Sequence, residues 1–185
     1  NQHPSQTLLD LYTIQKEFGK LEGHTIAFVG DLKYGRTVHS LVKALTHFGA
    51  KLYFVAPETL QMPKYILEDL DSLGIEYTLL NDYREIMGEI DVFYMTRIQR
   101  ERFPDDEEYE KVKDVYILNK EEGVGKAKEE MIILHPLPRV NEIAVNLDDT
   151  KHALYFKQAA NGVPVRQALL SLSLGYKAKL QEGDK

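Results

Sequence analysis

The amino-acid sequence predicts an α/β fold: a doubly wound, mainly parallel five-stranded sheet of the Rossmann-like type, with helices on both faces. Short apolar runs alternate along the chain with longer stretches in which apolar residues recur at helical spacing. Glycine or proline follows most of these segments, as is typical of their ends. The strand–helix–strand unit recurs about every 20 to 30 residues, and such repetition indicates parallel strands joined by helices.

Five apolar runs predict the strands. Residues 25–29 (Thr-Ile-Ala-Phe-Val) end at Gly30, and residues 52–55 (Leu-Tyr-Phe-Val) end shortly before Pro57. Continuous apolar runs of this length are typical of strands that are buried on both faces of a parallel sheet. The other three predicted strands, in chain order, are residues 75–80, 91–95 and 131–134.

Apolar residues that lie three and four positions apart predict the helices. Residues 7–18 carry such a stripe and end at Gly19, and residues 37–48 carry a second stripe that ends at Gly49. Two later helices have proline in the first turn, where its missing N–H is tolerated. These two helices are residues 63–73 and 164–180, and a short helix at residues 83–87 lies between them.

The composition is that of one globular domain that spans residues 1–185. Hydrophobic residues make up 43% of the chain, and no apolar run reaches the ~20 residues that a membrane span requires. The formal net charge of −6 argues against nucleic-acid binding, which needs a basic face. The chain has no cysteine and opens without a signal-peptide pattern, so we expect a cytoplasmic protein without disulfides or thiolate metal sites.

Polar residues directly follow three of the predicted strands. Arg36 and Thr37 come after the first strand, where they open a helix. Arg97 and Gln99 follow the fourth strand, and residues 135–139 (His-Pro-Leu-Pro-Arg) follow the fifth. Ligands of open α/β sheets bind beyond the carboxyl ends of the strands, where the strand order reverses. If the first strand lies beside the fourth and the fourth beside the fifth, these groups converge on one crevice.

The converging groups fit a small amino dicarboxylate. The guanidinium groups of Arg36 and Arg97 can each pair with one carboxylate in a bidentate manner. Gln99 offers an acceptor to an amine. Because Pro136 and Pro138 fix the backbone and lack N–H groups, carbonyl groups of this segment can face the same amine. Aspartate has this combination of groups.

Each of these residues also has a structural interpretation. Arg97 taken alone is more typical of a surface arginine, and His135 fits a hydrogen-bonded structural histidine as well as a site residue. Residues 30–36 resemble a nucleotide-binding turn, but their glycine spacing is not Gly-x-Gly-x-x-Gly and Lys33 is not in a Walker position. We predict no metal and no cofactor, since four other histidines show no metal-ligand spacing: His24, His39, His47 and His152.

Three longer motifs resemble those of the aspartate carbamoyltransferases. They are residues 1–6 (Asn-Gln-His-Pro-Ser-Gln), 30–37 (Gly-Asp-Leu-Lys-Tyr-Gly-Arg-Thr) and 135–139. The resemblance extends from residue 1 to about residue 175 and implies the aspartate-binding domain of such an enzyme. The implied reaction belongs to pyrimidine biosynthesis. The amine of L-aspartate attacks carbamoyl phosphate, which yields N-carbamoyl-L-aspartate and phosphate without a metal.

The resemblance also implies roles for individual residues. His3 is expected to donate a hydrogen bond to the carbamoyl oxygen as the catalytic group, and Gln6 to contact the carbamoyl nitrogen. Arg36 is expected to hold the α-carboxylate of aspartate, and Arg97 its side-chain carboxylate. The other implied aspartate-binding residues are Thr37, Gln99, Pro136 and Leu137, the last two through their carbonyl groups.

The charged segment after the fourth strand predicts a lid. Residues 98–113 are long for a connection and begin among the proposed substrate ligands. The resemblance implies that Glu101 and Arg102 form ion pairs with another domain on closure, and that Tyr109 lies in the same closing segment. Asn141 stands where some bacterial members have an aspartate that braces this segment, which argues against feedback regulation of that style.

The family has a carbamoyl-phosphate domain upstream of the aspartate domain, and residues 1–185 show no match to its phosphate-binding segment. We therefore expect this chain to be inactive alone and to require that missing domain as a partner. Residues 1–20 and 163–185 are expected to form inter-domain helices. The complete catalytic chains are expected to form a homotrimer, with or without regulatory chains.

Three alternatives differ from this interpretation. An ornithine-type carbamoyltransferase half is disfavoured, because Arg97 would repel the cationic side chain of ornithine. Ornithine enzymes also have cysteine after the histidine, where this chain has Pro136. The second alternative is a noncatalytic ligand-binding or assembly module of the same fold. The third is a nucleotide-binding α/β enzyme, which a test of aspartate binding against nucleotide binding would distinguish from the others.

Overall fold

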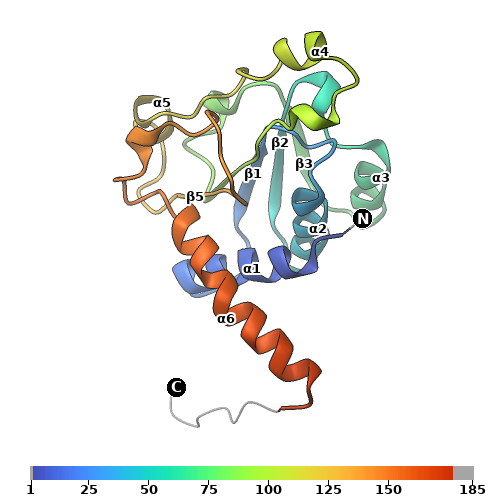
Figure 1. The fold of residues 1–185 in the computed structure, drawn as a ribbon, viewed down its shortest axis with the longest axis vertical. Coiled ribbons are helices and arrows are strands. Elements are labelled where there is room, and N and C mark those ends of the chain that lie inside the picture. The colour runs from blue at the N-terminus through green and yellow to red at the C-terminus, as the bar shows by residue number, and fades with distance from the viewer. Residues whose placement is uncertain (1, 177–185) are drawn as a thin grey trace.

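The computed structural model describes residues 2–176, which form one five-stranded sheet with the order β3-β2-β1-β4-β5 (Figure 1). The strands are β1 (Thr25–Val29), β2 (Lys51–Val55), β3 (Tyr77–Leu80), β4 (Val92–Met95) and β5 (Ile132–Leu134). All four neighbouring pairs are parallel. The chain builds outward from β1 to β3 and then returns to the other side of β1 at β4. The predicted doubly wound α/β fold is confirmed.

Helices of very different lengths flank and connect the strands. Within the described residues the α-helices are α1 (Pro4–Phe18), α2 (Arg36–Leu45), α3 (Lys64–Ser72), α4 (Asp106–Glu110), α5 (Lys120–Val124) and α6 (Tyr155–Ser173). Single 3₁₀ turns are η1 (Thr46–Phe48), η2 (Glu58–Leu60), η3 (Tyr83–Glu85), η4 (Arg100–Arg102) and η5 (Val145–Leu147). The two longest helices, α1 and α6, pack against each other. None of the helices described here has the length and apolar character needed to cross a membrane.

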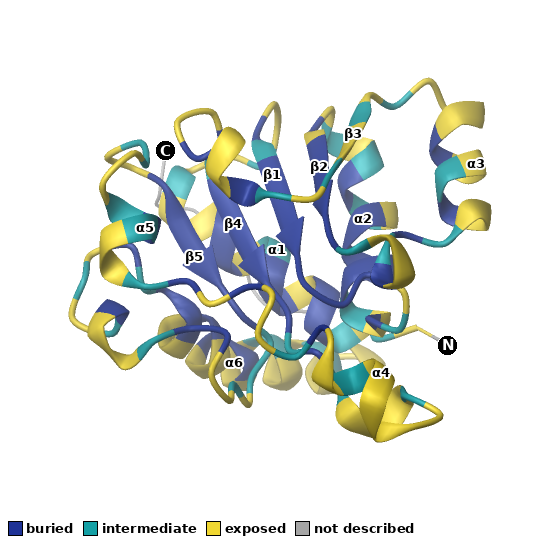
Figure 2. Ribbon diagram, turned by 90° about the horizontal axis from the view of Figure 1, so that it is seen from above, coloured by how far each residue is buried: buried dark blue, intermediate teal, exposed yellow. Residues whose placement is uncertain are grey.

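Strands β1, β2, β4 and β5 are almost entirely buried, whereas the edge strand β3 is partly exposed. Successive side chains of a strand point to opposite faces, so apolar side chains pack on each face of the sheet. Ile26 and Phe28 of β1 pack with residues of α1, α2 and α3 on one face, whereas Ala27 and Val29 pack on the other. Short segments and the first residue of α6 cover that second face through a set of large side chains: Tyr83, Met87, Leu118, Ile143, Leu147 and Tyr155. Figure 2 shows β1, β2, β4 and β5 as a buried layer, with exposed residues in the helices and loops around it. The strand ends are therefore rigidly placed.

The last helix begins earlier than the sequence predicts. The sequence places Pro164 in the first turn, whereas α6 begins at Tyr155 and Pro164 lies inside it. An interior proline removes one backbone hydrogen bond. Packing on α1 offsets this cost, since α6 donates two buried side-chain hydrogen bonds to α1, from Gln158 and Asn161. Residues 177–185, which include the predicted end of this helix, lie outside the described residues.

Two short helices lie in segments for which the sequence predicts no helix. α4 lies within residues 98–113, and Asp105 caps it by accepting a hydrogen bond from the Glu108 N–H at 2.8 Å. Asn119 caps α5 in the same way by accepting from the Glu122 N–H at 2.9 Å. Helices this short contain too few apolar residues to show helical spacing. Only their capping residues mark them in the sequence.

A buried carboxyl group ties together α1, α6 and β4. Asp10 is fully buried and accepts side-chain hydrogen bonds from Gln6 Nε2 at 2.8 Å, Gln158 Nε2 at 2.6 Å and Tyr94 Oη at 2.8 Å. Burial raises the pKa of Asp10 to about 7, although the three hydrogen bonds act in the opposite direction. Folding therefore favours the protonated carboxyl group over the ionised one, relative to the unfolded chain.

The raised pKa of Asp10 predicts a pH-dependent stability. Because the folded-state pKa lies above the ordinary value of 3.8, its contribution is present at low pH and is lost as the pH rises through about 7. Asp10→Asn cannot ionise. From about pH 5 to about pH 8, the free energy of unfolding of the wild type should fall by about 2 to 3 kcal/mol relative to this variant. Urea unfolding at both pH values measures the difference, and parallel profiles would contradict it.

Candidate functional site

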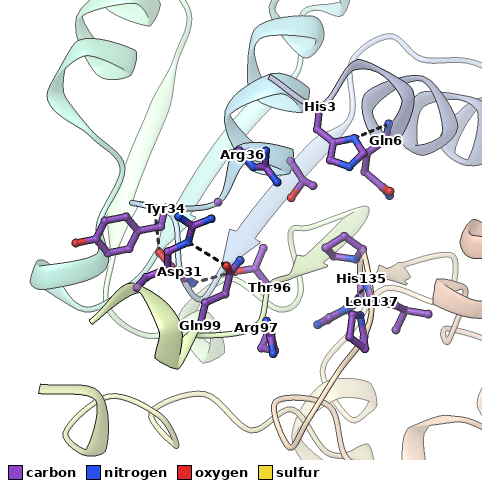
Figure 3. Close-up of a pocket in the computed structure, with 15 residues that line it drawn as sticks. His3, Gln6, Asp31, Tyr34, Arg36, Thr96, Arg97, Gln99, His135 and Leu137 are labelled. Carbon is purple, nitrogen blue, oxygen red and sulfur yellow. Dashed lines mark hydrogen bonds between the residues drawn. The ribbon is translucent and has the colours of Figure 1, made fainter. Parts of the chain in front are cut away.

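One cavity of ≈ 210 Å³ lies where the carboxyl ends of β1, β4 and β5 meet the start of α1 (Figure 3). The strand neighbours that were assumed for this convergence, β1–β4 and β4–β5, are present in the sheet. Eight residues that the sequence assigns to substrate binding line this cavity: His3, Gln6, Arg36, Thr37, Arg97, Gln99, Pro136 and Leu137. The strand order thus brings together residues from four separate parts of the chain.

The ends of β1 and β4 approach closely because Gly30 has no side chain. Gly30 has a φ of +115°, and a Cβ atom there would lie 2.4 Å from the carbonyl oxygen of Thr96. The Thr96 hydroxyl accepts a hydrogen bond from the Asp31 N–H at 2.9 Å and donates one to the Val29 carbonyl at 3.1 Å. These contacts hold Asp31 and Arg97, which follow the two strands, at the same cavity.

Arg36 begins α2, whose N-terminus lies at the cavity. Gly35 precedes it and has no side chain to cap the first N–H groups, and Thr37 lies in the same turn. Free N–H groups and the helix dipole favour an anion at this position. Within residues 2–176 the arginines that form ion pairs are Arg84, Arg97, Arg100 and Arg139. Arg36 is therefore available to a carboxylate.

Arg97 lies on the opposite side of the cavity from Arg36 (Figure 3). Its Nη2 atom pairs with Glu101 Oε1 at 2.8 Å, and the exposed fraction of the Arg97 side chain is 32%. Arg102 Nε donates a long hydrogen bond to Gln99 Oε1 at 3.4 Å. Exposed contacts of this kind stabilise a protein little. A ligand can therefore replace them.

The segment after β5 holds its backbone in an unusual conformation. Leu137 has a φ of 54°, and a cis peptide bond joins it to Pro138. The Leu137 N–H donates to His135 Nδ1 at 2.8 Å, so the proton of this imidazole is on Nε2, which donates to Glu142 Oε1 at 2.8 Å. Neither the Pro136 nor the Leu137 carbonyl accepts a backbone hydrogen bond within the described residues. Both carbonyl groups are free for a ligand.

The Glu142 carboxylate stabilises this segment by accepting hydrogen bonds from His135 Nε2 and from the Val140 N–H. Burial raises the pKa of Glu142, but the hydrogen bonds from His135 and from backbone N–H groups outweigh it, and the net pKa is lowered. The carboxylate is thus charged at neutral pH and directs the His135 ring. His135 is fully engaged in holding the backbone, which supports its structural interpretation. Residues 2–176 contain no group of three or more acidic or histidine side chains placed to hold a metal ion.

His3 and Gln6 approach the cavity from the start of α1 (Figure 3). His3 caps this helix, and its Nδ1 atom accepts a hydrogen bond from the Gln6 N–H at 3.3 Å. An imidazole that accepts through Nδ1 carries its proton on Nε2 when neutral. His3 therefore offers one N–H donor at the cavity.

Comparison with known proteins supplies the family. Residues 22–173 match the family described as "Aspartate/ornithine carbamoyltransferase, Asp/Orn binding domain". The chain belongs to this carbamoyltransferase family. The aspartate carbamoyltransferase catalytic subunit of Brachyspira hyodysenteriae is 57% identical over 173 residues, which cover 94% of this chain and 48% of that protein. The catalytic subunit of Thermococcus kodakarensis is 57% identical over 175 residues, which cover 95% and 56%.

Solved structures of carbamoyltransferases have the same fold. The catalytic subunit of M. jannaschii aspartate transcarbamoylase superposes with a TM-score of 0.86 at 52% identity, and covers 100% of this chain and 58% of its own. The Trypanosoma cruzi enzyme in complex with N-(phosphonacetyl)-L-aspartic acid gives a TM-score of 0.84 at 39% identity, and covers 92% and 55%. The chain therefore spans about half the length of the carbamoyltransferases that it matches.

The cavity of this carbamoyltransferase domain includes residues that sequence reasoning did not select. Asp31 is buried, and its Oδ1 accepts from the Tyr34 N–H at 2.9 Å, whereas Oδ2 has no partner among the described residues. Burial raises the pKa of Asp31, against backbone hydrogen bonds and the charge of Arg102, which lower it. Thr96 also lines the cavity. The position of Asp31, directly after Gly30 at a strand end, is the signal in the sequence that marks it.

The three residues predicted for the lid lie in different environments. Glu101 pairs with Arg97, as described above. Tyr109 of α4 does not line the cavity, and its ring packs against Phe103 with centroids 5.6 Å apart. Arg102 lines the cavity. The Asn141 side chain donates a hydrogen bond to Asp114, one residue beyond the predicted lid.

The close approach at Gly30 predicts a large cost for any side chain there. Gly30→Ala places Cβ against the Thr96 backbone at a φ that L residues rarely adopt, so the free energy of unfolding should fall by about 3 kcal/mol or more. Gly49→Ala is the matched control, since Gly49 has a φ of +60° but nothing within 4 Å of the new Cβ, and it should cost about 1 kcal/mol. Equal losses in the two variants, measured by urea unfolding, would contradict this account.

Proposed function

We propose that the chain is the aspartate-binding part of an aspartate carbamoyltransferase, which transfers the carbamoyl group of carbamoyl phosphate to the amine of L-aspartate. One observation carries this proposal: Arg36 and Arg97 lie on opposite sides of a cavity that the Pro136 and Leu137 carbonyl segment also lines. Two guanidinium groups and free carbonyl groups complement two carboxylates and one amine. The catalytic subunits that this chain resembles support the same reaction.

Both carboxylates of aspartate have a partner in this proposal. Arg36 holds the α-carboxylate, with support from Thr37 and the N-terminus of α2. Arg97 holds the side-chain carboxylate, and its pair with Glu101 supports this role because a carboxylate oxygen already lies 2.8 Å from the guanidinium group. Aspartate replaces Glu101 on binding. Glu101 and Arg102 are then free to pair with a neighbouring domain.

The amine of aspartate is the nucleophile. The Pro136 and Leu137 carbonyl groups accept hydrogen bonds from it, and Gln99 lies at the same cavity. His135 keeps these carbonyl groups in place through its hydrogen bond from the Leu137 N–H. The amine adds to the carbonyl carbon and forms the new C–N bond, and the bond from this carbon to the phosphate oxygen then breaks. The amine loses a proton in this step, and the departing phosphate accepts it.

His3 stabilises the charge that grows on the carbamoyl oxygen. Its Nδ1 accepts from the Gln6 N–H, so the Nε2–H is the donor that this oxygen needs. One preorganised donor to a developing oxyanion lowers the barrier by about 3 kcal/mol. Gln6 contacts the carbamoyl nitrogen beside it.

A carbamoyl-phosphate domain, outside residues 1–185, completes the site by binding the phosphate group. Two observations support this part of the proposal. The chain spans about half the length of its relatives, and α1 and α6 expose apolar side chains that a neighbouring domain can cover: Leu8, Val163, Leu170 and Leu172. Residues 1–185 alone are then inactive. The complete chains form homotrimers. They act in the cytoplasm, and the absence of cysteine from the sequence is in keeping with that reducing compartment.

Arg97 also distinguishes aspartate from ornithine, the other amino acid in the family description. The side chain of ornithine ends in a cation, which a guanidinium group repels. The full-length gene product should form carbamoyl aspartate from carbamoyl phosphate and aspartate, and should form no citrulline from ornithine.

Replacing Arg97 with lysine tests the assignment directly. Lysine keeps the charge but lacks the planar fork, so Arg97→Lys should lose about 2 to 4 kcal/mol of transition-state binding. In the full-length enzyme this loss lowers kcat/KM for aspartate about 30- to 1000-fold. Arg100→Lys is the matched control, since Arg100 pairs with Asp106 outside the cavity. Similar kcat/KM values for the two variants would rule out the role of Arg97.

The proposed lid should respond to ligand. Residues 98–113 carry exposed ion pairs and follow the cavity directly, so domain closure should slow their amide hydrogen exchange. In the full-length enzyme, we expect slower exchange of this segment with N-(phosphonacetyl)-L-aspartic acid than without it. α3 lies away from the cavity and serves as the internal reference. Unchanged exchange in residues 98–113 counts against a lid.

A further inference from the structure

A residue outside the cavity sets the orientation of Gln6 inside it. The Gln6 side chain lines the cavity, and its Nε2 donates to Asp10 Oδ1 at 2.8 Å. Asp10 is fully buried and does not line the cavity. Because Nε2 is committed to Asp10, the amide acceptor Oε1 is directed away from that carboxyl group. Gln6 Oε1 has no hydrogen-bond partner among the described residues.

The same carboxyl oxygen orients a second glutamine. Gln158 Nε2 donates to Asp10 Oδ1 at 2.6 Å, so Gln158 Oε1 accepts from the His135 N–H at 2.8 Å. Tyr94 Oη donates to the other oxygen, Oδ2, at 2.8 Å. Reversing either amide would place its oxygen against Oδ1, where both atoms are acceptors. Asp10 therefore holds both glutamine amides in one orientation. Through Gln158 it also fixes the acceptor for the His135 N–H, at the start of the segment after β5.

We propose that Asp10 is a positioning residue that makes the carbamoyl end of the cavity selective for N–H donors. It acts through Gln6, whose Oε1 accepts a hydrogen bond from the amino group of the carbamoyl substrate. The inference rests on the proposed function, in which Gln6 contacts this nitrogen. Acetyl phosphate has a methyl group in place of the amino group, so it leaves Oε1 desolvated without a partner. Asp10 thus selects a carbamoyl group over an acetyl group.

This selection does not require Asp10 to be charged. A proton on Asp10 Oδ2 can be donated to Tyr94 Oη, because a hydroxyl group accepts as well as donates. Oδ1 then still accepts from both glutamines. Asparagine reproduces this neutral arrangement with Nδ2 in the place of the protonated oxygen. The group that matters for selectivity is the single acceptor Oδ1.

The test compares two acyl phosphates in the full-length gene product that contains this chain. It measures kcat/KM for carbamoyl phosphate with saturating aspartate, and the inhibition constant of acetyl phosphate. Asp10→Leu keeps a similar size but provides no acceptor, so the Gln6 amide loses its fixed orientation. We expect kcat/KM for carbamoyl phosphate to fall about 10- to 100-fold, while the inhibition constant of acetyl phosphate changes by less than about threefold.

Asp10→Asn and Thr13→Val are the matched variants. The preference for carbamoyl phosphate is its kcat/KM multiplied by the inhibition constant of acetyl phosphate. Asp10→Asn keeps Oδ1, so this preference should stay within about threefold of the wild type. Thr13→Val removes another buried hydrogen bond between α1 and α6, which Asn161 Nδ2 donates to Thr13 Oγ1 at 3.0 Å. Neither Thr13 nor Asn161 lines the substrate cavity. Thr13→Val should therefore leave the preference unchanged.

The outcomes separate this inference from the proposed function. A wild-type enzyme that forms no carbamoyl aspartate overturns the proposed function. With an active wild type, the inference is overturned if Asp10→Leu weakens both acyl phosphates in parallel, or if Thr13→Val or Asp10→Asn shifts the preference as much as Asp10→Leu does. Should Asp10→Leu not fold, Asp10→Ala is expected to shift the preference in the same direction by a smaller factor. An unchanged preference in Asp10→Ala overturns the inference.

Discussion

The site depends above all on the parallel pairing of β1 with β4. Val29 lies opposite Met95 in this pair, so both strands end at the same level and the residues that follow them meet. Side chains alternate along a strand, and a slip of one residue would exchange the two faces of β4, so that side chains fitted to one core would point into the other. Gly30 permits the close approach, and the Thr96 hydroxyl bridges the two strand ends. The two arginines reach one cavity because these backbones are joined.

Polar contacts around the cavity fall into two groups that differ in burial. The buried group holds the backbone and the amide orientations, and it contains Asp10 with its three donors and His135 with Glu142. Breaking such contacts leaves a buried polar atom without a partner, which is costly. The exposed group, represented by the Arg97–Glu101 pair, costs little to exchange. A rigid frame with replaceable contacts at its surface suits a site that binds and releases a small charged molecule.

The sequence by itself determined the fold class and the polar residues that follow three of the strands, whereas the strand neighbours had to be assumed and come from the structure. Buried strands of a parallel sheet are continuous apolar runs, and each run in this chain is bounded by residues that end strands. Polar residues directly after a strand lie at the carboxyl edge of the sheet, since all parallel strands end at that edge. Arg36, Arg97 and residues 135–138 could therefore be assigned to one crevice once the common strand order of such sheets was assumed.

Only the tertiary structure decided the features that depend on contacts between distant parts of the chain. Pro164 marks a helix start in local sequence, yet packing against α1 carries α6 through it. The tautomer of His135 follows from Glu142 and from the backbone of Leu137, and neither contact shows in a residue pattern. Asp10 looks like an ordinary surface residue of an amphipathic helix, although it is buried with a raised pKa. The physical reason is common to all three: burial and hydrogen-bond partners are properties of the assembled layers, whereas spacing along the chain reports only which face each residue occupies.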